Sequence, residues 1–139
     1  MSFKTLIICA VLVALVFVGS IAAIRLLATR IDTARQGASI KLAQTQIDLF
    51  DNDLEFYAMD MDEFPSQSAA LAALKSVPQD AKRPKQWAGP YHKKDIPLDP
   101  WGQAYHYQFP GPRHANIKPD VWSSGPDGES GTSDDIVNK

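Results

Sequence analysis

Cysteine is nearly absent from the chain: Cys9 is the only one, so no disulfide can form within it. Proline is missing from the whole first part, because all ten prolines lie from Pro65 onward. The net charge of −2 over 139 residues provides no broad basic field, which argues against nucleic acid as a partner. This length leaves room for one membrane anchor and one small domain, held by a modest core and by something else, such as a metal ion.

Charge is missing from residues 6–24, which Lys4 precedes and Arg25 follows. The stretch is about as long as an α-helix that crosses the ~30 Å hydrocarbon core of a bilayer. A secretory signal peptide also begins with a basic residue and an apolar run, but its apolar core usually spans about 7–15 residues. A buried core helix is a second alternative, although the rest of the chain has little apolar sequence to surround it. We predict a short leader over residues 1–5 and a transmembrane segment over residues 6–24.

Helix-forming residues continue beyond this segment, and apolar or small residues recur at steps of three and four in two stripes, each typical of one face of an α-helix. The first stripe comprises Leu27, Ile31, Ala34, Ala38, Leu42, Thr45 and Leu49, and the second comprises Ile40, Ala43, Ile47, Phe50, Leu54 and Tyr57. They predict one nearly continuous helix from about residue 3 to residue 58, roughly 80 Å long, in which residues 25–58 extend the anchor. The first half is expected to contact lipid or other subunits, and the small residues of the first stripe favour close packing between helices.

The residues that follow, 59–139, predict a small domain. Phe64-Pro65 ends the long helix, because the residue before proline is disfavoured in the helical conformation. Ser66 or Ser68 can cap a short second helix over residues 69–75, which would pack on the second stripe. The acidic residues around the end of the long helix are predicted to form a solvated face: Asp51, Asp53, Glu55, Asp60, Asp62 and Glu63.

Two segments of this domain are typical of β-strands. Residues 104–109 alternate, with Tyr105 and Tyr107 on one side and His106 on the other, and residues 120–123 form a second short strand. Between the helix and these strands, Asp-Pro-Trp-Gly at 99–102 is typical of a tight turn. Residues 124–139 are predicted to form a loop. The sequence therefore predicts an α+β fold with one long helix and a short antiparallel sheet.

The closing loop is rich in acid and has no base before its last residue. Five acidic side chains lie between Asp120 and Asn138, and they would repel each other unless a cation lay among them. A hard cation such as Ca²⁺ takes carboxylate and carbonyl oxygens of this kind. The EF-hand spacing is missing, since glycine directly follows Asp127 instead of standing at the sixth position. A calcium loop and a solvated acidic tail both remain open at this point.

Other chemistry is less well supported by the sequence. The three histidines, His92, His106 and His114, lack the spacing of metal ligands, and no serine, histidine and aspartate combination is typical of nucleophilic catalysis. Paired carboxylates of the kind used in glycoside hydrolysis remain conceivable, but the domain is small for a deep cleft. The aromatic residues favour core and turn packing over a sugar-binding platform. We therefore expect a protein that is not an enzyme.

Ordered motifs along residues 34–138 resemble one known family, the major pseudopilins of bacterial type II secretion, which are type IV pilin-like G subunits. The motifs include Ala34-Arg35-Gln36-x-Ala38, Tyr57-x-x-Asp60-x-x-x-Phe64-Pro65 and Trp87-x-Gly89-Pro90-Tyr91. The most specific are Pro97-x-Asp99-Pro100-Trp101-Gly102-x-x-Tyr105-x-Tyr107 and Ser124-Gly125-x-Asp127-Gly128, followed by Gly131-Thr132-x-Asp134-Asp135-Ile136.

The resemblance implies a type IV pilin-like fold and a calcium site in the last loop. By position, Asp127, Asp134 and Asp135 would supply side-chain oxygens, and Ser124 a backbone carbonyl oxygen. It also implies a single-pass protein of the bacterial inner membrane with its C-terminal domain in the periplasm. Such a subunit self-associates into a helical filament, contacts other pseudopilins or secretion components, and supports protein export. The alternative is a monomeric, membrane-tethered and calcium-stabilised binding module that kept the fold but lost polymerisation.

The N-terminus departs from the family pattern. No glycine stands before Phe3, and Ile8 replaces the glutamate that the family has in its apolar segment. The proline that interrupts the family's long helix is absent as well. We therefore predict that a prepilin peptidase does not trim this N-terminus, and the missing proline agrees with one nearly continuous helix.

Overall fold

The computed structural model describes the backbone of residues 3–139 and the side chains of residues 18–139. It divides into two units, Met1–Gly37 and Ala38–Lys139. The side chains of the predicted leader and of most of the predicted transmembrane segment lie outside the described residues. The prediction that the N-terminus is not trimmed also concerns residues outside this range. Among the residues that were described, no helix is both long and apolar enough to cross a membrane.

Helix α1, Phe3–Met61, is the predicted long helix, and it continues three residues beyond the predicted end. It is unbroken, as expected from the missing proline. It ends where Asp62 takes a left-handed conformation with φ of 60°. A residue of this kind is a common helix terminator, and aspartate tolerates it better than most side chains do. The helix therefore stops before Phe64-Pro65.

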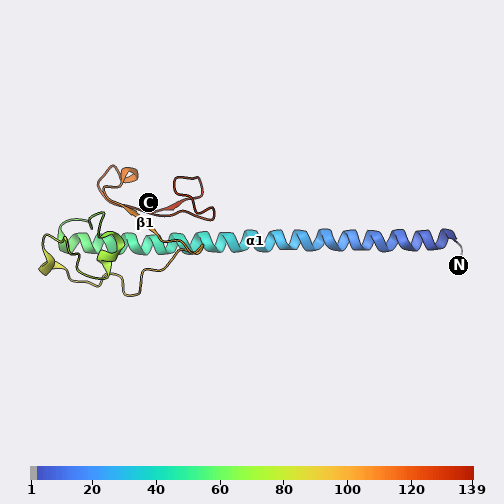
Figure 1. Cartoon of the computed structure of the whole chain (residues 1–139), viewed down its shortest axis with the longest axis horizontal. Helices are drawn as coiled ribbons and strands as arrows, with labels where there is room; N and C mark the ends of the chain where they lie inside the picture. The colour runs from blue at the N-terminus through green and yellow to red at the C-terminus, as the bar shows by residue number, and fades with distance from the viewer. Residues whose placement is uncertain (1–2) are drawn as a thin grey trace. The chain divides into compact units, whose positions relative to one another are not determined.

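The second stripe of α1 forms the core of the unit Ala38–Lys139. From Ala43 to Tyr57 its residues are almost fully buried, whereas Ile40 stays exposed. The segments that follow α1 lie along its last turns (Figure 1). Phe50 is central, with ring centroids 5.2 Å from Tyr105 and 5.1 Å from His92. The core thus joins the helix to segments that lie more than forty positions further along the chain.

The predicted short second helix is a 3₁₀-helix, η1, Ala70–Leu74, rather than an α-helix. The predicted capping by Ser66 or Ser68 is wrong, because Ala69 stands at the N-cap position and has no side-chain cap; the Ser66 hydroxyl instead accepts the Ala69 amide at 3.1 Å in the turn before η1. Leu71 and Leu74 are buried in the same core as the second stripe, as predicted. Two further 3₁₀-helices follow, η2, Pro84–Gln86, and η3, Pro112–His114.

The sheet is antiparallel, as predicted, and has the order β1-β2-β3. Strand β1, His106–Gln108, is shorter than predicted, and β2, Asp120–Ser123, has the predicted bounds. Strand β3, Ile136–Val137, corrects the prediction that residues 124–139 are all loop. Ser123 pairs with Ile136 and Trp122 with Val137, so the end of the chain returns to the sheet.

The predicted solvated acidic face is wrong for Asp51 and Asp53, which are partly buried, whereas Glu55, Asp60 and Asp62 are exposed as predicted. Asp51 accepts hydrogen bonds from Lys118 at 3.1 Å and Asn138 at 2.6 Å, and Asp53 Oδ2 lies 2.7 Å from His92 Nδ1. The remaining partners are contributed by loops: Tyr91 for Asp60, Arg83 for Asp62 and Lys82 for Glu63. Asp51 and Asp53 thus attach later segments of the domain to the helix.

Candidate functional site

The acidic loop, residues 124–135, is the first candidate site. It begins directly after β2 and ends directly before β3, and the pairing of Ser123 with Ile136 closes it at its base. Gly125 allows the two arms to approach: a Cβ there would lie 2.4 Å from the Asp134 carbonyl oxygen, and its φ is +66°. Only glycine fits such a contact in this conformation without strain. The two arms of the loop therefore lie side by side where Gly125 meets Asp134, which also brings Ser124 close to Asp134 in the chain fold.

Asp99 supports the start of this loop, and the sequence did not single it out beyond its turn motif. One carboxylate oxygen accepts the amides of Trp101 and Gln103, at 3.0 and 2.8 Å. The other accepts the Ser123 hydroxyl at 2.5 Å. The Ser123 oxygen in turn accepts the Gly125 amide at 3.2 Å. The tight turn at 99–102 and the acidic loop are thus joined by a buried carboxylate.

Two of the predicted calcium ligands are hydrogen-bond acceptors inside the loop. Asp127 accepts the Glu129 amide at 2.8 Å. Asp134 accepts the Thr132 hydroxyl at 2.6 Å and the Asp127 amide at 3.2 Å. The hydrogen bond from Thr132 is the main cause that lowers the pKa of Asp134. This hydrogen bond stabilises the charged form of Asp134, which is the form that binds a metal.

Asp135 has a different environment. Its Oδ2 accepts the Gly131 amide at 2.9 Å and lies 3.6 Å from an Arg113 Nη atom. The side chain is only 5% exposed, and its Oδ1 is buried with no hydrogen-bond partner. A buried charged oxygen without a partner is costly, and such cases are rare in native proteins. This atom is the feature of the loop that a bound cation would satisfy.

Ser124, the fourth predicted ligand, is buried, and its hydroxyl lies 2.9 Å from His106 Nε2 and 3.0 Å from the Ser130 hydroxyl. Its side chain is therefore used within the protein, which leaves only its backbone carbonyl for the predicted role. No group of three or more His, Cys, Asp or Glu side chains that could hold a metal is found among the described residues. A cation here would depend on carbonyl and water oxygens as well as carboxylates, a mixture that calcium accepts.

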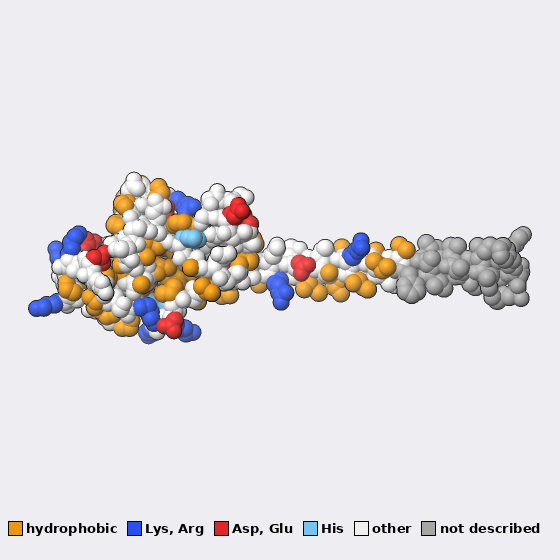
Figure 2. Space-filling view, in the orientation of Figure 1, with side chains coloured by type: hydrophobic (Ala, Val, Ile, Leu, Met, Phe, Trp, Pro, Cys, Tyr) orange, Lys and Arg blue, Asp and Glu red, His pale blue; other side chains and the backbone are white. Residues whose placement is uncertain are grey.

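The exposed face of α1 is the second candidate site. Side chains 42, 49, 56 and 59 point about 100–160° away from the centre of the buried stripe, since each residue advances about 100°. All four are apolar and exposed, with Phe56 at 60% and Met59 at 74%. Earlier on the helix, Leu27 and Ile31 of the first stripe are exposed as well. Figure 2 shows hydrophobic side chains along the surface of the described helix.

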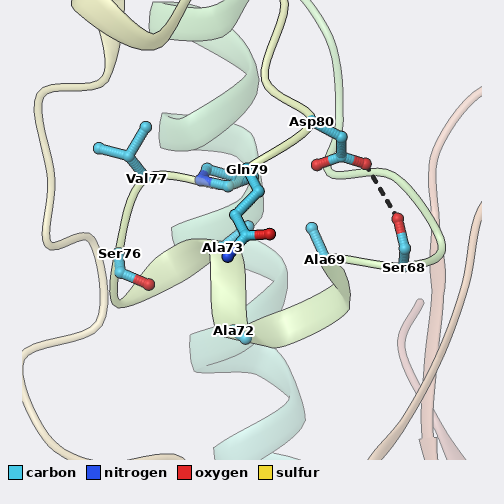
Figure 3. A pocket seen from close by; sticks show the side chains of 9 residues that line it. Ser68, Ala69, Ala72, Ala73, Ser76, Val77, Gln79 and Asp80 are labelled. Atoms are coloured by element: carbon cyan, nitrogen blue, oxygen red, sulfur yellow. Dashed lines mark hydrogen bonds between the residues drawn. The ribbon is translucent and has the colours of Figure 1, made fainter.

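A pocket of about 430 Å³ lies beside η1 and is lined mostly by small side chains (Figure 3). Asp80 is its one charged residue, and it accepts hydrogen bonds from the hydroxyls of Ser66 and Ser68. The bond from Ser66 is the main cause that lowers the Asp80 pKa. The lining holds no histidine, lysine or cysteine, and the Ser68 hydroxyl is used as a hydrogen-bond donor to Asp80.

Comparison with known proteins agrees with the fold and with the resemblance. Residues 30–139 match the family described as type II secretion system protein G. The type II secretion system core protein G of Aeromonas hydrophila is 35% identical over 104 residues, which are 75% of this chain and 71% of that protein. The Pseudomonas aeruginosa core protein G is 32% identical over 124 residues, 89% of this chain and 84% of that protein.

A solved structure has the same fold. It is the crystal structure of the major pseudopilin from the type 2 secretion system of enterohaemorrhagic Escherichia coli, with a TM-score of 0.66 and 29% identity. The similarity covers 76% of this chain and 87% of that one. One long helix carrying a small three-stranded antiparallel sheet is thus the pilin-like fold. The chain belongs to the type II secretion system protein G family.

Proposed function

We propose that this protein is a structural subunit of a type II secretion pseudopilus, or of a related pilin-like filament, that supports protein export. The observation that carries the proposal is that α1 has apolar side chains on two of its faces. One apolar stripe is buried beneath the domain, while the opposite one remains exposed along Leu42, Leu49 and Phe56. Folding of the domain accounts only for the buried second stripe. A second copy of the chain accounts for the other.

In this proposal the first part of α1 is the single-pass anchor in the inner membrane, and the unit Ala38–Lys139 lies in the periplasm. The support is the uncharged sequence at residues 6–24 together with membership of the family. Copies related by a screw operation would make heterologous contacts, which build open filaments instead of closed rings. Other pseudopilins and secretion components would bind the same assembly.

Charge placed in the exposed stripe tests the assembly. We expect Ala38→Arg to abolish cross-linked ladders of the full chain in membranes, because an unpaired charge in a packed seam costs several kcal/mol. Gln36→Arg is the matched control, since residue 36 lies on the opposite side of the helix from residues 34 and 38. Near-ultraviolet circular dichroism should show that both variants keep the folded domain.

Equal ladders from the parent and Ala38→Arg would remove this face from the interface. A parent that gives a single monomer band under every cross-linking condition would favour the alternative, a monomeric membrane-tethered binding module. Ala34→Glu provides a second charge on the same face and should behave like Ala38→Arg.

The proposal also includes one calcium ion in the acidic loop. Asp127, Asp134 and Asp135 would hold it through side-chain oxygens and Ser124 through its carbonyl oxygen. The support is the unpartnered, buried Oδ1 of Asp135 and the charged state favoured at Asp134. The ion would supply positive charge and coordination that stabilise the return of the chain to β3.

Melting of the full chain in calcium and in chelator tests this part. Binding to the folded state stabilises by about 2.7 kcal/mol at a hundred times Kd, so calcium should raise Tm and magnesium should raise it less. Asp134→Asn, which keeps the hydrogen-bond acceptor for Thr132, should remove the calcium response. Identical melting of the parent in calcium and in chelator would reduce the loop to a solvated acidic tail.

A further inference from the structure

Arg113 lies beside the acidic loop although it belongs to a separate segment, η3. Its position is fixed by the buried Asp120 of β2, which accepts the Arg113 amide at 3.1 Å. The same carboxylate lies 2.7 Å from the His114 ring. These contacts hold the backbone of η3 against the sheet and thereby fix the point from which the Arg113 side chain extends.

The guanidinium group is held by two further contacts. Its Cζ lies 5.3 Å from the centre of the Trp122 ring, a cation–π distance, and one Nη lies 3.6 Å from Asp135 Oδ2. The Trp122 indole in turn donates to the Ser130 hydroxyl at 2.8 Å, within the loop. Contacts with Trp122 of β2 and with the loop therefore place the Arg113 guanidinium beside Asp135.

The charges of this region do not balance. The loop carries four acids, Asp127, Glu129, Asp134 and Asp135. Within the part of the chain that the structure describes, Arg113 is the only cationic side chain in an ion pair with any of them. It contacts Oδ2 of Asp135, whereas the unpartnered atom of that carboxylate is Oδ1. One oxygen is thus stabilised by the protein, and the other is left for a cation.

We propose that Arg113 is the resident counter-charge of the acidic loop: it supports Asp135 when no calcium is bound and limits the affinity of the loop for calcium. The proposal rests on the calcium site of the proposed function. A positive side chain near the site reduces repulsion among the carboxylates, which favours the calcium-free fold. The same positive charge repels a divalent cation, so the Kd for calcium is higher than the carboxylates alone would give.

The test is calcium titration of the full chain in mild detergent by calorimetry, with Tm measured in calcium and in chelator. Arg113→Gln should lower the Tm in chelator and bind calcium about three- to tenfold more tightly at low ionic strength, because one repulsive charge has been removed. The difference from the parent should shrink in high salt, which screens the half-exposed guanidinium. A merely structural role would not depend on salt in this way.

Three variants separate charge from shape. Arg113→Lys keeps the charge and should stay within about twofold of the parent Kd. Arg83→Gln removes a positive charge that pairs with Asp62, directly after α1, and not with the loop, so it should leave the Kd unchanged. Arg113→Met removes the charge but keeps an apolar stem for Trp122. If the neutral variants unfold in chelator, calcium should restore the fold.

Several outcomes would overturn the proposal. Calcium binding by the parent with equal or weaker binding by Arg113→Gln would refute it while leaving the calcium site in place. Neutral variants that stay unfolded in both chelator and calcium would show that Arg113 is needed for more than its charge. A parent that shows neither binding heat nor a calcium-dependent Tm would remove the calcium site and this role together.

Discussion

Asn138 joins the end of the chain to both the helix and the sheet, and its removal should be among the most damaging single changes outside the core. The residue is only 4% exposed. Its amide nitrogen donates to Asp51 at 2.6 Å and to the Pro119 carbonyl at 3.0 Å, and its amide oxygen accepts from the Val121 amide at 3.0 Å. One side chain thus connects α1, β2 and the segment that follows β3.

Asn138→Ala would remove all three side-chain bonds and leave buried partners unsatisfied. A hydrogen bond contributes about 0.5–1.5 kcal/mol net, bonds to charged groups contribute more, and an orphaned buried group costs about 1–3 kcal/mol. Asp51 keeps its contact with Lys118, which offsets part of the loss. We expect a loss of about 3 kcal/mol, which corresponds to a fall in Tm of about 12 °C or more for a unit of roughly 100 residues.

Near-ultraviolet circular dichroism of the full chain is a suitable assay, because every tryptophan and tyrosine lies in the unit Ala38–Lys139. Asn52→Ala is the matched control: its amide bonds the Asp48 carbonyl on the exposed helix surface, and the change should stay within about 0.5 kcal/mol. A double-mutant cycle with Asp51→Ala should give a coupling of about 0.5–3 kcal/mol. Equal melting of Asn138→Ala and Asn52→Ala would refute the reasoning.

Two further predictions concern β1 and its surroundings. Gln67 covers the free edge of β1, since its side-chain amide donates to the Tyr107 carbonyl at 2.8 Å and accepts the Phe109 amide at 3.0 Å. Gln67→Ala should lower the free energy of unfolding by about 1–2 kcal/mol and speed hydrogen exchange at the Phe109 amide. Unchanged exchange at Phe109 would contradict this role. Burial raises the pKa of Tyr107, whose hydroxyl donates to the Pro65 carbonyl at 2.6 Å. A tyrosine whose pKa is higher in the folded than in the unfolded protein stabilises the folded state at pH values below the unfolded pKa of about 10, and this stabilisation is lost as the pH rises beyond it. The parent should therefore lose stability above about pH 10, and Tyr107→Phe should lose less over the same range. Parallel pH profiles for the two proteins would refute the second prediction.

The long helix and its core face were predictable because apolar periodicity carries that information. The missing proline and the two apolar stripes predict the end of α1 to within three residues of the observed end. The buried stripe from Ala43 to Tyr57 is the predicted one. Strand β2 was found from its short apolar run. Strand β3 was missed because it has only two residues, Ile136 and Val137, between glycine-rich acidic sequence and the chain end.

The polar contacts were not predictable in the same way. Asn138 and Asp51 are 87 positions apart, and neither stands in a periodic pattern that would reveal its partner. Asp99 was noticed as part of a turn, but its bond to Ser123 depends on the folded arrangement. Arg113 gave no signal at all. The four predicted calcium ligands came from resemblance, whereas the unpartnered Oδ1 of Asp135 became visible only with coordinates.

The two sides of α1 differ in how well the domain explains them. Ala43, Ile47 and Phe50 are fully buried, and the acids beside them are paired with loops of the same unit. Opposite them, Phe56 and Met59 expose most of their surface. Burying a side chain of this size is worth about 1.5–3 kcal/mol, so an exposed row of them forgoes several kcal/mol in an isolated subunit. Domain folding gives no reason for that row, because the core is complete without it. Contact with another copy of the chain would recover this free energy, and it would do so along a helix whose other face already carries the domain outward.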